Sequence, residues 1–302
     1  MLSSPVHSAG GRRFLPSRSS ILLGMLLSLA LILAACGGSS APSSGGGNAT
    51  SNKYGLITPG VLTVGSDTTY PPQEFIDPAT NQPKGFDIDL ITEIARRLGL
   101  QARIVTDGFD TIFDDLAARR FDLVISAVTI NPDRQKKFDF IPYFNAGESL
   151  LVEKGNPLHI TSVDQLCGQN VGVQTGTVEQ TDLQTASENC TKAGKPPIHL
   201  TVLKDQTEVV QLLANHRVVA TYQDSPVTDY YLKQNPGKFE VGGSVVNAAP
   251  EGIMFRKGDT ALYNAVKNAF DAMRSDGTYK QLIDKWGVTS GAISLVERRT
   301  LL

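Results

Sequence analysis

The sequence is poor in the residues that build metal and catalytic centres. Its 302 residues include three cysteines and four histidines, namely His7, His159, His199 and His216. These histidines lack the spacing of a metal-ligand set, so we expect no metal site. The nucleophile-elbow and phosphate-cradling motifs of common enzymes are also missing from the part expected to fold. The sequence therefore predicts neither a cofactor nor a catalytic site.

There is no excess of basic charge. Lys and Arg together number 28 against 30 Asp and Glu, which gives a formal net charge of −2. A nucleic-acid-binding surface would need a basic stripe, so we expect no nucleic-acid partner. The hydrophobic fraction of 41% is too high for a disordered chain and is enough for one large domain or two smaller ones.

Only one apolar run is long enough to resemble a membrane segment. Residues 1–20 carry Arg12, Arg13 and Arg18 but no acidic residue, and an apolar run follows at 21–35. This pattern is typical of a secretory signal peptide. The alternative is a transmembrane anchor, but the run has about 15 residues, fewer than the ~20 that span a bilayer. We therefore expect residues 1–35 to be a signal peptide.

The run ends in Leu33-Ala34-Ala35-Cys36, which resembles a bacterial lipobox. In such a segment the cysteine is lipidated and the residues before it are removed. Residues 37–53 are mostly Gly, Ser, Ala and Asn, so we expect residues 36–54 to be a flexible tether. The protein would then be held at the cell membrane, on the extracytoplasmic side, through lipid alone.

The two other cysteines fit such a compartment. If Cys36 carries lipid, Cys167 and Cys190 remain as the only pair available for a disulfide. A loop of this length would stabilise the fold by about 3 kcal/mol in the chain-entropy model. The alternative is two unrelated buried thiols.

Strand and helix signals alternate twice along the chain. The first series has strands at 61–64, 102–105 and 123–126, a helix capped by Asp87 that ends at Gly99, and a helix at 111–120. The second series has strands at 171–174, 200–202 and 218–222, a helix from Thr177, and a helix at 208–215. These are followed by a strand at 252–255, a helix at 261–274 and a short helix that ends near Trp286. This rhythm predicts two α/β lobes, each with a parallel sheet, and a ligand crevice beyond the carboxyl ends of their strands.

Polar side chains follow several of these strands. Asn131 and Pro132 form a strong helix start, which places Arg134 in a first turn, where a guanidinium and free backbone N–H groups suit a carboxylate. Arg134 could equally be a surface residue paired with an acid. Asp224 could hold a cation such as an α-ammonium, or could cap the next helix.

Three further residues extend this set. Thr177 begins a capping box that offers backbone donors, although this could be an ordinary helix cap. Tyr70 and Phe109 could form the walls around an amphipathic ligand, or could belong to the core. Taken together, these groups could hold a zwitterion such as an amino acid by both of its charges.

The sequence resembles the family 3 bacterial extracellular solute-binding proteins, the polar amino-acid receptors of ABC importers. The resemblance covers residues 60–287 and is carried by VGSDTTYPP (64–72), GFDIDL (85–90), TINPDR (129–134), VGVQTGT (171–177) and DGTY (276–279). It implies a two-lobed periplasmic-binding-protein (type II) fold. Lobe 1 would comprise residues 55–146 plus 248–302, and lobe 2 residues 147–247. It also implies a monomer whose partners are an amino acid and the membrane subunits of an ABC permease.

The resemblance assigns roles to individual residues. Arg134 would bind the ligand α-carboxylate with help from Thr129 and the Thr177 region. Asp224 would take the α-ammonium, assisted by the backbone carbonyl of Ala127.

Other positions would shape the space for the ligand side chain. Tyr70 and Phe109 would enclose the ligand, and Asp67 would face its side chain, which favours a polar or basic amino acid. Relatives vary at Ser126 and Ala127. They often have a second threonine where this chain has Val178, so a hydroxyl contact there is lost.

Two other functions remain open. The same fold hosts a dehydratase that acts on cyclohexadienyl acids, for which Asp67 would be the evident spare carboxylate. It also serves as a ligand sensor, and signalling would then need a separate partner. We expect a binding protein, not an enzyme.

Overall fold

The computed structural model describes residues 52–293. The predicted signal peptide, Cys36 and nearly all of the predicted tether lie outside the described residues. Within 52–293, no helix is both long enough and apolar enough to cross a membrane.

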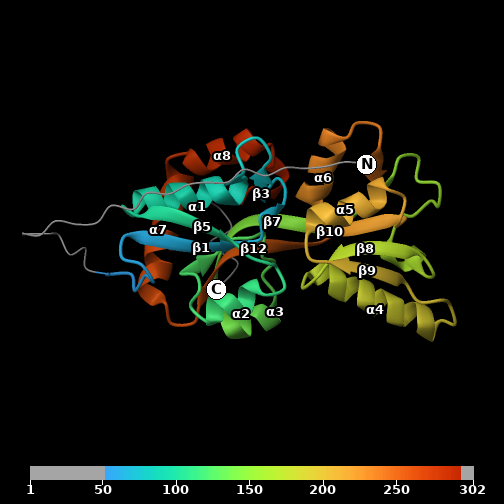
Figure 1. Cartoon of the computed structure of the whole chain (residues 1–302), viewed down its shortest axis with the longest axis horizontal. Helices are drawn as coiled ribbons and strands as arrows, with labels where there is room; N and C mark the ends of the chain where they lie inside the picture. Colours follow the sequence, from blue (N-terminus) through green and yellow to red (C-terminus); the bar gives the residue numbers. More distant parts are fainter. Residues whose placement is uncertain (1–51, 294–302) are drawn as a thin grey trace, which may run out of the picture. The chain divides into compact units, whose positions relative to one another are not determined.

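A nine-stranded sheet forms the centre of this body (Figure 1). At one end lie three parallel strands: β5 (Gln101–Thr106), β1 (Val61–Ser66) and β6 (Leu123–Val124). At the other end lie three more: β10 (Ala220–Asp224), β8 (Asn170–Gln174) and β9 (His199–Leu203). We call these ends, with the helices that cover them, the first and second lobes. The two parallel sets confirm the prediction of a two-lobed α/β fold.

Two long antiparallel strands join the lobes. β7 (Phe138–Glu153) pairs with β12 (Val246–Arg256) and, further along, with β10 and the short β11 (Phe239–Val241). The sequence interpretation missed β7 and saw only the end of β12. Pro142 and Gly147 lie inside β7, and such residues normally argue against a strand interior. Each lobe's sheet is therefore mixed, not purely parallel as predicted.

Helices cover both faces of the sheet in each lobe (Figure 1). The first lobe has α1 (Phe86–Arg97), α2 (Ile112–Ala117), α3 (Pro132–Lys137), α7 (Thr260–Ser275) and α8 (Thr278–Trp286). The second has α4 (Val178–Lys192), α5 (Gln206–Ala214) and α6 (Ser225–Gln234). The small elements are β2 (Thr69–Tyr70), β3 (Glu74–Asp77), β4 (Gln82–Lys84) and the 3₁₀ turns Val163–Leu166 and Thr289–Gly291. Each lobe has apolar core clusters of its own.

Helix α1 does not begin as predicted. Gly85, not Asp87, is its N-cap, with a φ of 144°. A Cβ on Gly85 would lie 2.0 Å from the carbonyl oxygen of Gln73, so only glycine fits there. The Asp87 side chain is fully buried, where it accepts hydrogen bonds from Tyr143 Oη (2.6 Å) and from the backbone N–H of Ala127 (3.0 Å). The capping prediction was wrong because these tertiary partners take the carboxylate away from the helix start.

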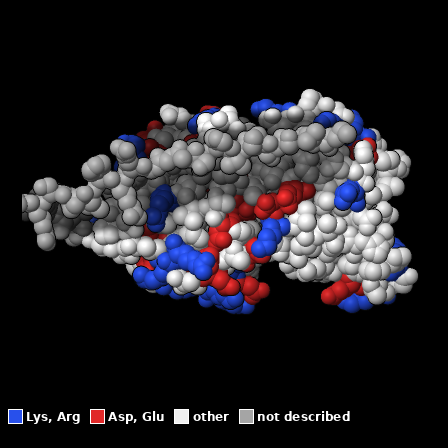
Figure 2. Space-filling view, in the orientation of Figure 1, with Lys and Arg blue, Asp and Glu red and all other residues white. Residues whose placement is uncertain are grey.

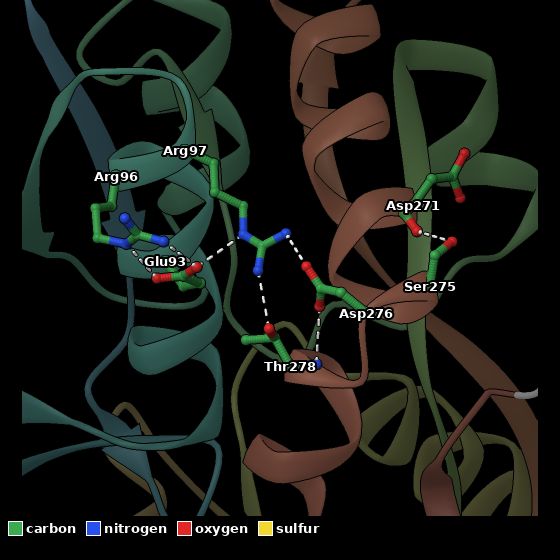
Figure 3. A network of polar contacts seen from close by, with 7 residues as sticks. All are labelled: Glu93, Arg96, Arg97, Asp271, Ser275, Asp276 and Thr278. Carbon is green, nitrogen blue, oxygen red and sulfur yellow. Dashed lines mark hydrogen bonds and ion pairs between the residues drawn. The ribbon is translucent and has the colours of Figure 1, made fainter.

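Arg97 links the DGTY turn between α7 and α8 to α1 (Figure 3). Its guanidinium donates to Asp276 Oδ2 at 2.7 Å, to Thr278 Oγ1 at 2.8 Å and to Glu93 Oε1 at 2.7 Å. Asp276 in turn accepts from the backbone N–H of Thr278. One side chain thus joins the C-terminal helices to the first helix of the lobe.

Charges of both signs lie intermixed over α2 and α3 on the face shown in Figure 2. Several form exposed ion pairs, including Arg120 with Asp115 (2.9 Å) and Lys136 with Asp133 (2.6 Å). Such pairs contribute little to stability because water and salt screen them.

Cys167 and Cys190 form a disulfide, 23 positions apart in sequence. It joins the segment before β8 to the last turns of α4, so it closes a loop inside the second lobe.

Replacing both cysteines with serine should lower the free energy of unfolding by about 3 kcal/mol, because the unfolded chain regains the entropy of the open loop. Urea unfolding of the two proteins measures this difference. Dithiothreitol should destabilise the wild type to a similar extent and leave the double variant unchanged. Equal stability of the two oxidised proteins would contradict the prediction.

Candidate functional site

A small cavity lies between the lobes. It is placed at the carboxyl ends of strands: Ser126 and Ala127 follow β6, Gln174 ends β8, and Asp224 ends β10. Eight of the nine predicted ligand residues line it: Tyr70, Phe109, Ser126, Ala127, Thr129, Arg134, Thr177 and Asp224. Gln174, Val178 and Glu179 complete the lining.

Arg134 stands in the first turn of α3, as its sequence predicts. Asn131 caps this helix by accepting the backbone N–H of Arg134 at 2.9 Å. The guanidinium donates to the carbonyls of Thr129 (2.7 Å) and Gly176 (3.2 Å) and lies over the rings of Phe109 and Phe113. Burial lowers the pKa of Arg134 to about 10. No carboxylate of the described residues forms an ion pair with it, so the surface-pair alternative does not hold in this structure.

Asp224 comes from the opposite lobe. It occupies the N-cap position of α6 but makes no capping hydrogen bond with its side chain. Instead its Oδ2 accepts from Tyr70 Oη at 3.0 Å, and its backbone N–H donates to the same hydroxyl at 3.0 Å. Burial raises the pKa of Asp224 to about 7, while the bond from Tyr70 opposes that shift. A cation placed beside Asp224 would favour its charged form.

The aromatic residues contribute apolar walls. Tyr70 packs with Ala127 and Val227, and Phe109 packs edge-on against Phe113 with ring centroids 5.5 Å apart. Tyr70 and Phe109 both line the cavity and are both well buried. The two predicted roles, as a wall of the ligand site and as part of the core, are therefore compatible.

The Ser126–Ala127 turn rests on buried carboxyl groups. Ser126 Oγ accepts from the backbone N–H of Asp67 (2.9 Å) and donates to Glu74 Oε1 (2.8 Å). Ala127 has a φ of 44°, in the left-handed region, and its N–H is held by Asp87. Burial together with the neighbouring Asp87 raises the pKa of Glu74 well above its ordinary value.

Thr177 caps α4, which confirms that part of the capping-box prediction. Its Oγ1 accepts from Gln180 N–H at 3.1 Å and donates to the carbonyl of Gln174 at 2.9 Å. The Gln180 side chain accepts from the N–H of Gly176, one residue before the position a capping box uses.

Asp67 is the one predicted ligand residue that does not line the cavity. Its carboxylate accepts hydrogen bonds from Gln174 Nε2, on the second lobe, and from Thr69 Oγ1 at 3.0 Å. Burial raises its pKa to about 7. In this structure Asp67 bonds the other lobe and does not face the ligand space.

Further bonds hold the lobes together around the cavity. The backbone N–H of Gln206 donates to Thr69 Oγ1 at 3.1 Å, in addition to the Tyr70–Asp224 and Arg134–Gly176 bonds. Gly176 has a φ of 78°, and a Cβ there would lie 3.2 Å from the Cα of Asp110. The close approach of the two backbones shows a closed arrangement of the cleft.

The sequence interpretation did not assign Gln174 or Glu179 to the site. Gln174 was visible as the polar residue that ends an apolar strand. Glu179 was visible only as part of the capping box, and helix periodicity does not reveal that its side chain turns into the cleft.

Two α/β lobes that close on one cavity, with a cationic side chain from one lobe and a carboxylate from the other, define a solute-binding protein of the two-lobed kind. The sequence pattern of the bacterial extracellular solute-binding proteins, family 3, matches residues 62–289. The chain belongs to this family.

Individual relatives agree with that assignment. The histidine-binding periplasmic protein of Salmonella typhimurium is 32% identical over 235 residues, covering 76% of this chain and 88% of its own. The solved structure of an ancestral arginine-binding protein bound to arginine is 36% identical, with a TM-score of 0.69 and coverage of 75% and 98%. That of the ancestral amino acid-binding protein AncCDT-1, a precursor of cyclohexadienyl dehydratase, is 37% identical, with a TM-score of 0.65 and coverage of 75% and 95%.

The buried Asp87 predicts a pH-dependent stability. Burial raises its pKa from 3.8 to about 7. Between these values the folded chain holds a proton that the unfolded chain has lost. The free energy of unfolding of the ligand-free protein should therefore fall as the pH rises from 5 to 7, by up to about 1.4 kcal/mol per pH unit for each such group.

Urea unfolding at pH 5, 6 and 7 measures this slope. Asp87→Asn should make it shallower, since one titrating group is gone while Asp67 and Asp224 still contribute in the same direction. The exposed Asp284→Asn is the matched control and should keep the wild-type slope. An unchanged slope in Asp87→Asn would contradict the prediction.

Proposed function

We propose that this chain is the substrate-binding lipoprotein of an ABC importer and that it binds a polar L-amino acid in the cleft. One observation carries the proposal: Arg134 on the first lobe and Asp224 on the second line the same cavity. A guanidinium suits an α-carboxylate and a carboxylate suits an α-ammonium, so a single amino acid can contact both lobes through its two charges.

This arrangement also supplies the mechanism of closure. A ligand that contacts both lobes binds the closed form better than the open form and shifts the population by that difference in affinity. The closed form then presents both lobes to the permease, which takes over the amino acid. The chain is therefore proposed to act as a monomeric binding protein without chemical turnover.

The division into lobes is proposed at residues 146/147 and 247/248. The core clusters support it, because those of the first lobe use residues up to 146 and from 253, and those of the second use residues 150–239. The lipid anchor is proposed at Cys36 from the lipobox. An extracytoplasmic location is supported by the Cys167–Cys190 disulfide, since such bonds persist in oxidising compartments.

A ligand panel tests the proposed function. Residues 37–302 are unfolded and refolded to remove bound ligand, and thermal unfolding is recorded with each of the twenty L-amino acids. A ligand at about a thousand times its Kd adds about 4 kcal/mol of stability, and a clear rise in Tm should follow. A rise with one or a few polar amino acids is expected. No rise with any of them would refute the α-amino-acid site.

Arg134→Ala should weaken binding of that amino acid by about 2–5 kcal/mol, because the ligand carboxylate is buried without its partner. This corresponds to a roughly 30- to 5000-fold rise in Kd, measured by isothermal titration calorimetry. Lys136→Ala is the matched control, since Lys136 lies on the same helix but is 73% exposed and pairs with Asp133. Equal Kd values for Arg134→Ala and wild type would refute the assignment.

A dehydratase is the second candidate function. The similarity to a dehydratase precursor favours it, and so does the buried carboxyl of Glu179 in the cavity, because general acid catalysis needs a protonated group beside the substrate. Incubation with prephenate separates the two functions. We expect no turnover, whereas product formed by the wild type and lost in Glu179→Gln would support the enzyme.

A further inference from the structure

Glu179 places a buried carboxyl group in the cavity, and one of its two oxygens lacks a hydrogen-bond partner within the described part of the chain. It is the second residue of α4, its side chain lines the cavity, and the residue is 2% exposed. Its Oε1 is buried without a hydrogen-bond partner among residues 52–293. A buried carboxylate oxygen without a partner is costly, so a group from outside the chain is the natural donor to this oxygen.

The charged and titratable groups around Glu179 come from several elements. Burial raises its pKa well above the ordinary value, Asp224 on β10 and Glu148 on β7 raise it further, and Arg134 on α3 opposes them. The charge of Glu179 also contributes to the raised pKa values of Tyr70 on β2 and Tyr222 on β10. In the ligand-free cleft the pKa of Glu179 therefore lies well above that of an exposed glutamate.

An amino acid with a neutral side chain would leave one carboxyl group of the cavity lining without a partner of opposite charge. Arg134 is the only cation among the lining residues, against two carboxyl groups, Asp224 and Glu179. The α-carboxylate and α-ammonium of an amino acid match Arg134 and Asp224. Glu179 is left over, and a second positive charge on the ligand would match it.

Asp67 lies outside the cavity lining in the arrangement of the cleft seen here. Both of its carboxylate oxygens are already bonded, one to Gln174 and the other to Thr69. Its place in the structure is the contact between the lobes, outside the cavity lining.

We infer that Glu179, not Asp67, selects the ligand, by accepting the side-chain cation of a basic amino acid on Oε1. The inference rests on the proposed function, since it assumes that Arg134 and Asp224 hold the α-groups. A cation at this position favours the ionised form of Glu179 and lowers its pKa, so binding of a basic amino acid should be accompanied by proton release from this carboxyl group. A neutral amino acid releases none from Glu179.

Glu179→Gln tests the inference, because it keeps the size of the side chain and removes its charge. Kd values for arginine, lysine and glutamine are measured by isothermal titration calorimetry with wild type and variant. We expect the wild type to prefer arginine or lysine, and the variant to lose about 10- to 100-fold in affinity for that ligand while glutamine changes by less than about threefold. Glu188→Gln is the matched control, an exposed position on the same helix that pairs with Lys192.

Repeating the titrations in buffers of different ionisation enthalpy counts the protons released. Wild type should release more protons than Glu179→Gln on binding a basic ligand, by up to one per ligand, a difference that a purely structural role would not produce.

Three outcomes would overturn the inference. Equal losses for all three ligands would place Glu179 at the α-ammonium. No loss for any ligand would remove it from recognition, and a loss of basic-ligand selectivity in Asp67→Asn instead would return that role to Asp67. Each leaves the proposed function intact, since the wild type still binds an amino acid. Failure of the wild type to bind any of the twenty amino acids would refute the proposed function itself.

Discussion

The antiparallel pairing of β7 with β12 joins the two lobes into one sheet. Every other strand of the nine-stranded sheet is hydrogen-bonded outward from this pair, and each lobe keeps its own apolar cores. In the closed arrangement, buried hydrogen bonds such as Tyr70–Asp224 and Asp67–Gln174 add contacts between the lobes to those of the two strands. The cleft lies between the two lobes, so ligand binding depends on how the β7–β12 pair positions them.

Burial of charge is the second constraint, and it determines what the cleft can hold. The closed arrangement removes Arg134, Asp224 and Glu179 from water. Burial lowers the pKa of Arg134 and raises the pKa values of Asp224 and Glu179, so it favours the neutral form of each group. A ligand that brings opposite charges reverses these penalties, whereas a ligand without them leaves the penalties in place. The proposed selectivity for a basic amino acid therefore rests on desolvation as much as on shape.

The sequence predicted the local elements well where a single helix or strand decides its own ends. Asn131 and Thr177 cap their helices as expected, because a cap needs only neighbouring backbone groups. β7 was missed since Pro142 and Gly147 look like strand breakers unless the partner strand and its bulges are known. Asp87 was misread as a cap because Tyr143, which binds it, lies 56 positions away in sequence.

The sequence by itself determined the two-lobed α/β class, the oppositely charged residues of the site and the family, since these rest on periodicity, strand ends and motifs. Only the tertiary structure decided which carboxylates face the ligand space. Asp67 lies within one motif at a strand end, and Glu179 comes two residues after another. In the closed cleft Asp67 is hydrogen-bonded to Gln174, whereas Glu179 Oε1 has no hydrogen bond and its residue lines the cavity. That choice depends on how close the lobes come, a distance between segments more than a hundred positions apart, which no local pattern encodes.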